Sequence, residues 1–515
     1  MINAPFKDIE LRLHTDFSGD DIRRIIGKKL KMKDFSYEIV KQSLDARKKP
    51  NVYWRVHLRV FSKALKGASF SSEPALIIPY QKRKTRVVVA GSGPAGFFSA
   101  YVLQKAGYQV TILEQGPETG ERYNDILQFE QGGQFKDNSN YCHGEGGAGT
   151  FSDGKLTSRT KGIAPEKRFV FDTYVKAGAP EEIKYFAKPH IGSDKLRRVI
   201  PDLRERFKNI GGSIFFNTGV TGLEINGNIC SAVIAGDDVF PCDLFIAAPG
   251  HSSYTTYRML YRYGIPFRSK PFAVGVRVEH PQELINEAQW LAPRLPGVKA
   301  AEYRLSFTAS NDLPVYSFCM CPGGKVVPSA PLHGHSLVNG VSDYARNSPF
   351  ANAAIVVGIN LTQLLQKETG FEESLRWVEE LERKAFRLTG SYRIPANRID
   401  DFLHQRISQQ IPENSYPLGT FPYDFESLLP REVIGTLRQG FQNFSRKIKG
   451  FETGVMLGLE TKTSAPVQAV RDQHRRCEGF GNIFIIGEGS GYAGGITSSA
   501  VDGVKTALDI ISADL

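Results

Sequence analysis

Residues 85–96 read TRVVVAGSGPAG, and this stretch decides the fold of the chain. The run of β-branched residues at 85–90 is typical of a buried parallel strand. The glycines of GSGPAG, at positions 91, 93 and 96, follow at once, and residues 94–106 predict a helix. In such a turn the first glycine permits a tight bend, the second admits a pyrophosphate close to the backbone, and the third lets the helix pack against the strand.

A second strand and an acidic residue complete this pattern. Residues 108–113 predict the strand, and Glu114 follows 18 residues past Gly96. A carboxylate at that place can accept ribose hydroxyls, while the helix N-terminus offers free N–H groups to phosphates. Together these elements predict a dinucleotide site, whereas a lone glycine turn would indicate much less. The residues expected to contact the dinucleotide are Gly91, Gly93, Pro94, Ala95, Gly96, Glu114, Gln115 and Arg122, the last of which also fits a surface arginine.

The composition excludes several classes of protein. A chain of 515 residues exceeds one ordinary core and predicts two or three domains. Its first residues lack the apolar centre of a signal peptide, and no apolar run approaches the roughly 20 residues of a membrane span. The six cysteines are scattered, which argues against a disulfide framework and for a reducing, cytoplasmic compartment. We therefore expect no membrane partner, and the cysteine and histidine spacing predicts no metal site.

The positive charge gathers at the N-terminus. Residues 1–86 hold 20 Lys and Arg against 9 Asp and Glu, so the whole excess of +11 lies there. Alternation at 8–13, a helical pattern beginning at Gly19, and further alternation up to residue 61 predict a βαββ order. We expect a small α+β module at 1–80, with residues 62–85 forming a linker.

The surface of this module allows three interpretations. Basic residues interleaved with aromatic ones are typical of nucleic-acid binding, although no RNA-binding signature is present. The same residues also fit docking to an acidic protein or substrate, or a merely solvated face whose aromatics belong to a core. They are Lys28, Lys29, Lys31, Lys33, Lys41, Arg47, Lys48 and Lys49, with Phe35, Tyr37, Tyr53 and Trp54.

The C-terminal segment narrows the dinucleotide to FAD. Residues 482–486 predict a buried strand that runs into Gly487-Glu488, and after a glycine-rich loop residues 496–511 predict a helix. This arrangement resembles the glutathione-reductase-type flavoproteins. The resemblance implies that Glu488, in place of the usual aspartate, binds the flavin ribitol. It also implies that Gly495 and Ile496 begin a helix directed at the flavin pyrimidine.

Four further stretches resemble a bacterial family of FAD-dependent dehydrogenases of unassigned substrate. They are GEGGAGTFSDGKL at 144–156, PFAVGVRVEH at 271–280, CMCPGG at 319–324 and GLETKTSAP at 458–466. With the two ends, the resemblance covers about residues 85–515. It implies an FAD-dependent oxidoreductase and says little about the substrate.

These segments predict an α/β fold in which a Rossmann-like FAD-binding domain is assembled from discontinuous pieces. The pieces lie at 85–271 and 451–515, and an α+β substrate domain is inserted at 272–450. Residues 211–212 and 248–250 do not form a second strand, glycine turn and helix. We therefore expect no separate nicotinamide domain, so NAD(P)H would bind only transiently or the substrate itself would donate the hydride.

The loop at 145–155 is expected to approach the flavin ring, because consecutive glycines permit close contact between the backbone and a flat ligand. Gly147, Thr150 and Ser152 would line the ring, and Lys155 would lie near N5 or a substrate anion. The alternative is a structural turn with a solvated lysine. Val220, at the start of a predicted strand, completes the expected cofactor contacts.

The sequence leaves the catalytic residue open. The candidates are Cys142, His143, Lys155 and Cys321. Cys142 beside His143 could be a reactive thiolate, although a packed cysteine and a hydrogen-bonded histidine fit as well. Cys319 and Cys321 end an apolar strand, where both sulfurs would point to one face. They could be a redox pair, a substrate-contacting rim or small core residues. Lys462 could place a cation near the flavin pyrimidine or lie in a solvated loop.

The function favoured by these observations is hydride transfer at flavin N5, to or from a small-molecule substrate, by an FAD-dependent dehydrogenase or reductase. The alternative is a binding protein, associated with nucleic acid or with another protein, in which FAD is structural or sensory.

Overall fold

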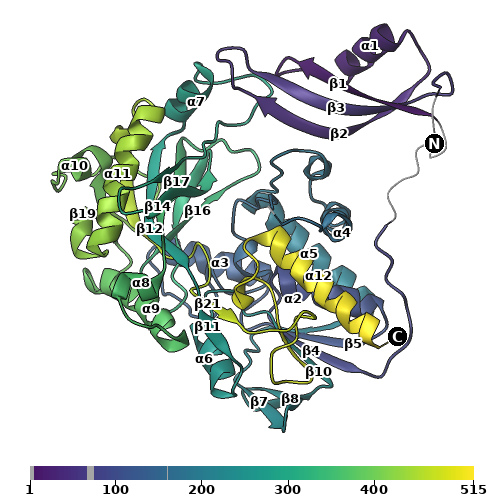
Figure 1. Ribbon diagram of the computed structural model, residues 1–515, viewed down its shortest axis with the longest axis vertical. Helices are drawn as coiled ribbons and strands as arrows, with labels where there is room; N and C mark the ends of the chain where they lie inside the picture. The colour runs from purple at the N-terminus through teal and green to yellow at the C-terminus, as the bar shows by residue number, and fades with distance from the viewer. Residues whose placement is uncertain (1–4, 67–74, 159, 515) are drawn as a thin grey trace.

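The chain has three parts, which Figure 1 shows. The computed structural model describes residues 5–66, 75–158 and 160–514. We call residues 5–66 the N-terminal module, residues 75–271 with 464–514 the parallel-sheet domain, and residues 272–463 the mixed-sheet domain. In the view of Figure 1 the module lies at the top, the mixed-sheet domain at the left and the parallel-sheet domain below and to the right.

The parallel-sheet domain is built on five parallel strands in the order β22-β10-β4-β5-β6. They are β4 (Arg86–Ala90), β5 (Gln109–Leu113), β6 (Ser213–Phe215), β10 (Leu244–Ala247) and β22 (Ile483–Ile485). One hydrophobic core lies on each face of the sheet, which explains the continuous apolar runs of the strands. Because β22 comes from the C-terminal segment, the predicted assembly of this Rossmann-like domain from discontinuous pieces is confirmed.

Helices and a small meander cover the two faces. The helices are α2 (Pro94–Lys105), α3 (Thr119–Glu130), α4 (Ala164–Lys176), α5 (Ser193–Asn209), α6 (Tyr254–Arg262) and α12 (Ile496–Ala513), with short 3-10 turns η1 (Gly147–Gly149), η2 (Glu181–Lys184) and η5 (Glu488–Ser490). The meander is β7 (Gly222–Asn226), β8 (Ile229–Ala235) and β9 (Asp238–Pro241), and β11 (Phe267–Ser269) pairs with β21 (Val467–Ala469). None of the helices in the described ranges is long and apolar enough to cross a membrane.

The C-terminal helix α12 packs directly on the start of α2. A Cβ added at Gly503 would lie 2.2 Å from the carbonyl oxygen of Ala95, and one added at Gly487 would lie 2.5 Å from the Ala95 Cβ. Such distances leave room only for glycine. The two ends of the domain therefore meet beside the glycine turn of residues 91–96.

The mixed-sheet domain contains seven strands in the order β13-β14-β17-β12-β20-β18-β19. They are β12 (Phe272–Pro281), β13 (Ser306–Thr308), β14 (Pro314–Cys321), β17 (Phe350–Ile359), β18 (Ile394–Arg398), β19 (Thr420–Pro422) and β20 (Val455–Glu460), and a separate hairpin is formed by β15 (Gly324–Pro328) and β16 (Val338–Ser342). The helical elements are α7 (Gln282–Trp290), α8 (Leu361–Leu365), α9 (Phe371–Arg387), α10 (Ile399–Leu403), η3 (Phe425–Ser427), α11 (Arg431–Lys447) and η4 (Phe451–Thr453). Nearly all of β12 is buried, since it runs through the middle of this sheet.

Strand β20 extends this sheet beyond the boundary expected at residue 450. The sequence placed residues 455–460 in the following piece, yet β20 pairs antiparallel with β12 on one side and with β18 on the other. The hydrogen bonds of an interior strand tie it to its sheet, so these residues belong with the inserted domain.

The N-terminal module has the predicted βαββ order. Its elements are β1 (Phe6–Leu13), α1 (Gly19–Leu30), β2 (Ser36–Asp45) and β3 (Tyr53–Phe61), and the antiparallel sheet has the order β1-β3-β2. The module docks on the parallel-sheet domain: Gln42 forms a parallel bridge with Phe186, and the Trp54 ring stacks on Phe186 at 5.8 Å between centroids. Residues 67–74 of the predicted linker lie outside the described residues.

Candidate functional site

The glycine turn at 91–96 has no room for larger side chains at its two ends. Gly91 has a φ of +100°, and a Cβ there would lie 2.5 Å from the Ala248 carbonyl oxygen. A Cβ at Gly96 would lie 1.9 Å from the Gly91 carbonyl oxygen. Gly93 is the N-cap of α2 and Pro94 its first residue, so the first free N–H groups of the helix belong to Ala95 and Gly96. A tight turn below a helix N-terminus is the geometry that a pyrophosphate requires.

Glu114 lies where the sequence placed it, at the carboxyl end of β5. Its side chain is buried and accepts hydrogen bonds from the backbone N–H of Ser92 at 2.9 Å and from the Ser92 hydroxyl at 2.7 Å. The other oxygen accepts the N–H of Gly116 at 3.0 Å. The carboxylate is therefore fixed against the glycine turn, and its predicted contact with a ribose stays a prediction. Gln115 lies against Gly219, the neighbour of Val220.

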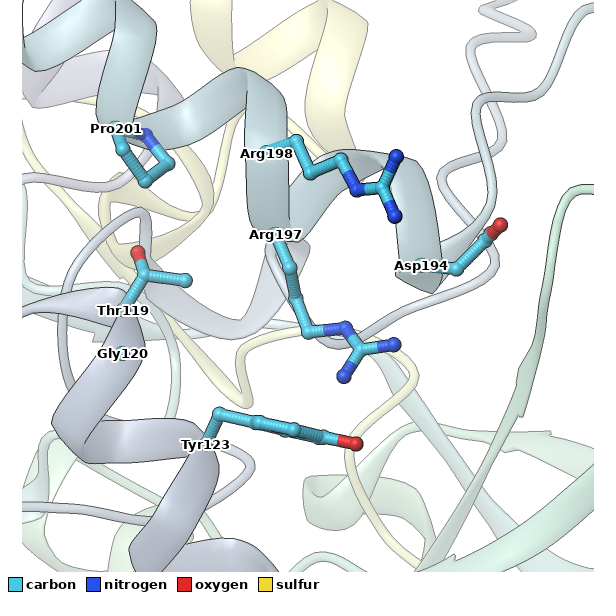
Figure 2. Close-up of a pocket in the computed structure, with 7 residues that line it drawn as sticks. All are labelled: Thr119, Gly120, Tyr123, Asp194, Arg197, Arg198 and Pro201. Atoms are coloured by element: carbon cyan, nitrogen blue, oxygen red, sulfur yellow. The ribbon is translucent and has the colours of Figure 1, made fainter.

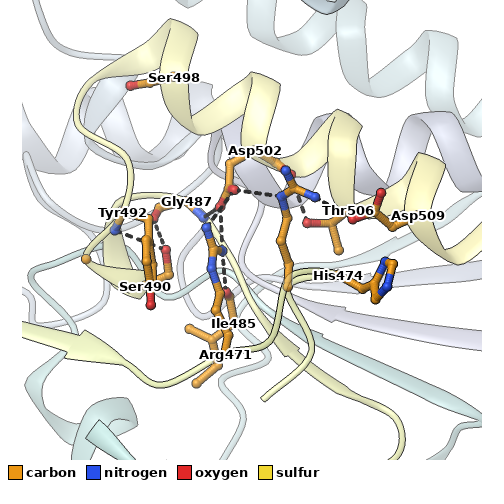
Figure 3. Close-up of polar contacts among 12 residues, drawn as sticks. Arg471, His474, Ile485, Gly487, Ser490, Tyr492, Ser498, Asp502, Thr506 and Asp509 are labelled. Carbon is orange, nitrogen blue, oxygen red and sulfur yellow. Dashed lines mark hydrogen bonds and ion pairs between the residues drawn. The ribbon is translucent and has the colours of Figure 1, made fainter. Parts of the chain in front are cut away.

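The C-terminal segment that contains Gly487 and Glu488 is held in place by Asp502 of α12. Figure 3 shows Asp502 at the centre of a polar network. Asp502 accepts the backbone N–H of Gly487 at 2.9 Å and forms an ion pair with Arg471 at 2.9 Å. Gly487 has a φ of +73°, which favours glycine. The network holds the turn that contains Glu488. Gly495, at φ +82°, is the N-cap of α12.

The loop after α3 is folded around a fully buried arginine. Arg122 donates hydrogen bonds to five backbone carbonyl groups, and the nearest pairs are Nη1 with Glu145 O and with Gly147 O, both at 2.8 Å. It is thus no surface arginine. Gly147 faces the glycine turn, because a Cβ added there would lie 3.1 Å from the Gly93 Cα. Arg122 therefore positions the loop against the turn, and its predicted contact with the phosphates stays a prediction.

Two hydroxyl groups of this loop shape its backbone. The Thr150 hydroxyl donates to Glu145 O at 2.8 Å, and the Ser152 hydroxyl donates to Gly149 O at 2.7 Å. A Cβ added at Gly149 would touch the Ile496 side chain at 3.3 Å. The loop and the start of α12 therefore lie together, as expected for two walls of one cofactor site.

We call the glycine turn at 91–96, the loop at 145–155 and the start of α12 the cofactor cradle. A buried polar cluster lies on the mixed-sheet side of this cradle. We call Tyr254, Glu382, Thr461 and Lys462 the lysine cluster. One carboxylate oxygen of Glu382 accepts hydrogen bonds from Thr461 at 2.6 Å and from Tyr254 at 2.9 Å, and it lies 3.2 Å from the Lys462 Nζ. Lys462 Nζ also donates to the Tyr254 hydroxyl. Lys462 is buried, so the solvated loop lysine considered from the sequence is wrong.

The segment at 251–252 connects the lysine cluster with the cofactor cradle. His251 Nδ1 lies 3.5 Å from a Glu488 carboxylate oxygen. Burial raises the pKa of the Cys142 thiol, and the nearby Lys462 and Ser252 oppose this rise. The predicted residues Glu488, Cys142 and Lys462 are therefore brought into one region by two residues that the sequence did not single out.

Three buried atoms in this region have no hydrogen-bond partner among the described residues: Glu382 Oε2, His251 Nε2 and His335 Nε2. The His335 ring lies 6.1 Å from the Tyr254 ring, and burial lowers its pKa. Unpaired buried polar atoms cost free energy, so several of them around one lysine indicate a place for a bound molecule. This observation fits a substrate site beside a cofactor.

Cys142 and His143 are buried and engaged. The Cys142 thiol donates to Ser329 O at 3.2 Å, and burial raises its pKa, so the reactive thiolate is disfavoured. Burial lowers the pKa of His143 to about 3, which leaves the imidazole neutral at physiological pH. Lys155 and Cys321, the other two candidates, contact each other, with 3.6 Å between Nζ and Sγ.

A separate hollow of about 330 Å³ lies between α3 and α5. Figure 2 shows the Arg197 guanidinium above the Tyr123 ring, and the distance from its Cζ to the ring centroid is 4.1 Å. The Glu145 carboxylate lies at the N-terminus of α3, where it accepts the Thr119 N–H at 2.7 Å. This hollow is distinct from the lysine cluster.

The sequence did not single out Tyr254, Glu382, His251 or His335. One signal was available: Glu382 stands four residues past Val378 and seven past Leu375 on the apolar stripe of α9, where both neighbours are buried. A carboxylate at a core position of an amphipathic helix indicates a buried partner. The two histidines lie in loops, and only the tertiary structure brings them to this region.

Three family models match parts of the chain. Residues 271–463 match the family described as FAD-dependent protein, C-terminal domain-like. Residues 89–147 match an NAD(P)-binding Rossmann-like domain, and residues 6–61 match a domain of unknown function. Together with the geometry of the glycine turn, these matches identify FAD as the cofactor of the chain.

Comparison with curated proteins gives a relative that matches over the full length. An uncharacterised protein of Clostridium beijerinckii is 39% identical over 528 residues, which cover 98% of each chain. The L-amino-acid oxidase of Pseudechis australis is 49% identical over 47 residues, only 9% of each chain.

Two solved structures illustrate a distant similarity. Glycine oxidase from Bacillus cereus has a TM-score of 0.38 and 11% identity, covering 84% of this chain and 96% of its own. L-proline dehydrogenase from P. horikoshii has a TM-score of 0.34 and 12% identity, covering 84% and 95%. Similarity at this level carries no argument about the reaction.

Proposed function

This chain belongs to the same family as the full-length clostridial protein and is an FAD-dependent oxidoreductase, and we propose that it oxidises a small amine or alcohol bound at the lysine cluster. The observation that carries the proposal is the set of unpartnered buried atoms around Lys462. FAD, when bound, supplies a two-electron acceptor. The residues of the chain then have to orient the substrate and take up its proton.

The unpartnered atoms are hydrogen-bond acceptors, which favours a substrate that carries an N–H or O–H group. His335 Nδ1 faces the carbonyl oxygen of His333 at 3.3 Å, so Nδ1 holds the proton and Nε2 is left to accept. His251 Nδ1 faces a carboxylate oxygen of Glu488, so its Nδ1 also holds the proton and its Nε2 is left to accept. The second oxygen of Glu382 is also an acceptor. Oxidation of an amine or alcohol releases such a proton, and these groups can receive it.

Lys462 and Tyr254 would fix the position of the substrate rather than carry its proton away. Burial and the neighbouring Glu382 raise the pKa of Tyr254 well above its ordinary value, so its hydroxyl stays protonated. The hydroxyl group holds its hydrogen bond to Glu382 and accepts one from Lys462. Charge in the cluster is therefore balanced, which suits a substrate whose reacting group is uncharged.

The test is anaerobic reduction of the flavin in the purified holoprotein. The reduction is measured as the loss of visible flavin absorbance. Amines, amino acids, alcohols and 2-hydroxy acids are the candidate donors, and NAD(P)H tests the opposite direction. Tyr254→Phe should retain the flavin but slow its reduction by about tenfold or more. Tyr261→Phe, on the exposed side of the same helix, is the matched control and should reduce at the wild-type rate.

Two outcomes would count against the proposal. If NAD(P)H bleaches the flavin and no amine or alcohol does, the flavin receives its electrons from NAD(P)H. That result would favour a reductase. An unchanged rate in Tyr254→Phe would remove the lysine cluster from the substrate site. We also propose a cytoplasmic location, which the scattered positions of the six cysteines favour.

A further inference from the structure

Two cysteines at the end of β14 are brought together by an irregularity in the strand. The pairing of β14 with β17 shifts register between Phe318 and Cys321, and Cys319 has a φ of +41°. The regular strand geometry assumed from the sequence is therefore wrong at this point, because a bulge interrupts the alternation of side chains. The Cys321 thiol donates to Cys319 O at 3.3 Å and also hydrogen bonds with the Cys319 sulfur.

Cationic side chains surround the two thiols. Lys155 Nζ lies 3.6 Å from Cys321 Sγ, and the Arg277 guanidinium donates to Cys319 O at 3.3 Å. The acidic groups nearby are Asp153, 3.4 Å from Lys155, and Glu460, 3.1 Å from Arg277.

Arg346 also forms an ion pair with Asp153 at 3.0 Å and lies 3.8 Å from Glu302, so three cations and three carboxylates surround the pair. Burial opposes the charge of Lys155, but Asp153 and the thiols raise its pKa overall. The hydrogen bond from Cys321, with Lys155 and Arg277 behind it, lowers the pKa of Cys319. A thiolate is the nucleophilic form of cysteine.

Solvent reaches one of the two sulfur-bearing residues. Cys319 is partly exposed and follows Phe318, whose side chain is 40% exposed, whereas Cys321 is fully buried. A second cysteine pair offers a contrast: Cys230 and Cys242 have their sulfurs 3.9 Å apart, but both residues are buried. The first pair thus combines a partly exposed residue with a fully buried one.

We propose that Cys319 and Cys321 form a redox-active dithiol that reacts with low-molecular-weight disulfides. The Cys319 thiolate attacks one sulfur of the disulfide, which forms a mixed disulfide and expels the first thiolate. Cys321 then loses its proton, attacks the Cys319 sulfur and expels the second thiolate. The chain is oxidised to a Cys319–Cys321 disulfide, and the small disulfide is reduced to two thiols.

The probe is the aromatic disulfide dithiobis(nitrobenzoate), applied to the full-length holoprotein at neutral pH. Wild type should release two thionitrobenzoate ions per chain in one fast phase and retain no adduct. Cys321→Ser should release one ion and keep one nitrobenzoate adduct, seen by intact mass. Cys319→Ser should lack the fast phase. In Lys155→Met the pH at which the fast phase reaches half its maximal rate should rise, because a cation that lowers the pKa of Cys319 is removed.

The matched control is Cys230→Ser, which should react like wild type. Peptide mapping of the oxidised wild type should find the Cys319–Cys321 disulfide, and this measurement does not depend on the folding of any variant. A stable adduct on wild-type Cys319 with release of a single ion would overturn the proposal. A wild-type fast phase in Cys319→Ser would do the same. Neither result depends on the proposed oxidation of an amine or alcohol.

Discussion

Lys462→Met is expected to lower the free energy of unfolding by about 3 kcal/mol, a loss typical of breaking a buried ion pair. The side chains of Lys462 and Glu382 are 4% and 0% exposed, and Nζ lies 3.2 Å from Oε1. At an effective dielectric constant of roughly 20, that separation corresponds to about 5 kcal/mol of attraction. The variant leaves Glu382 charged and buried, but Tyr254 and Thr461 still donate to it, which limits the loss.

The assay is a double-mutant cycle in urea with Lys462→Met, Glu382→Gln and the double variant. Because the two side chains share one contact, the losses should not add: the double variant should be more stable than the sum predicts by about 1–3 kcal/mol. Arg387→Met is the control on the same helix, since Arg387 pairs with Glu380 and both side chains are more than half exposed. It should change the free energy of unfolding by less than about 1 kcal/mol.

Additive losses within experimental error would refute the argument, because they would mean that Lys462 and Glu382 do not interact in solution. A loss in Lys462→Met no larger than in Arg387→Met would refute it as well.

Three further changes test the cradle and the core. Gly96→Ala should abolish retention of FAD on a desalting column, because its Cβ would lie 1.9 Å from the Gly91 carbonyl oxygen. Asp502→Ala should weaken FAD binding at least tenfold by fluorescence titration, since it removes the acceptor that holds the Gly487 N–H. Burial lowers the pKa of His280 from 6.5 to about 4, so the unfolded chain binds one more proton between these values and stability falls as the pH falls. His280→Gln should remove about 1.4 kcal/mol per pH unit from that slope, measured by urea unfolding at pH 6.5 to 4.

Each of these three predictions has a control variant or an outcome that would contradict it. Gly435→Ala, a helical glycine with open space around it, should keep FAD and normal stability; equal losses in both glycine variants would point to general damage. Asp509, which Figure 3 labels, forms an ion pair with Arg475, and Asp509→Asn should leave FAD affinity unchanged. An identical pH slope in wild type and His280→Gln would show that this histidine is protonated in the folded chain.

The sequence by itself determined the glycine turn at 91–96 and the place of Glu114 beside it. Strand, glycine turn, helix and Glu114 are local in the chain, and each depends on backbone geometry that only certain residues permit. The C-terminal strand and Gly487 could be predicted for the same reason. The βαββ order of the N-terminal module followed from its hydrophobic pattern, because the spacing of apolar residues shows which face of a strand or helix is buried.

Only the tertiary structure decided which residues form the lysine cluster. Tyr254, Glu382 and Lys462 come from α6, α9 and the segment after β20, and no spacing in the sequence relates residues from three separate elements. The bulge that joins Cys319 to Cys321 likewise arises from pairing with β17, a partner strand distant in the chain. Local patterns fix turns and faces, whereas buried polar contacts depend on how those faces meet.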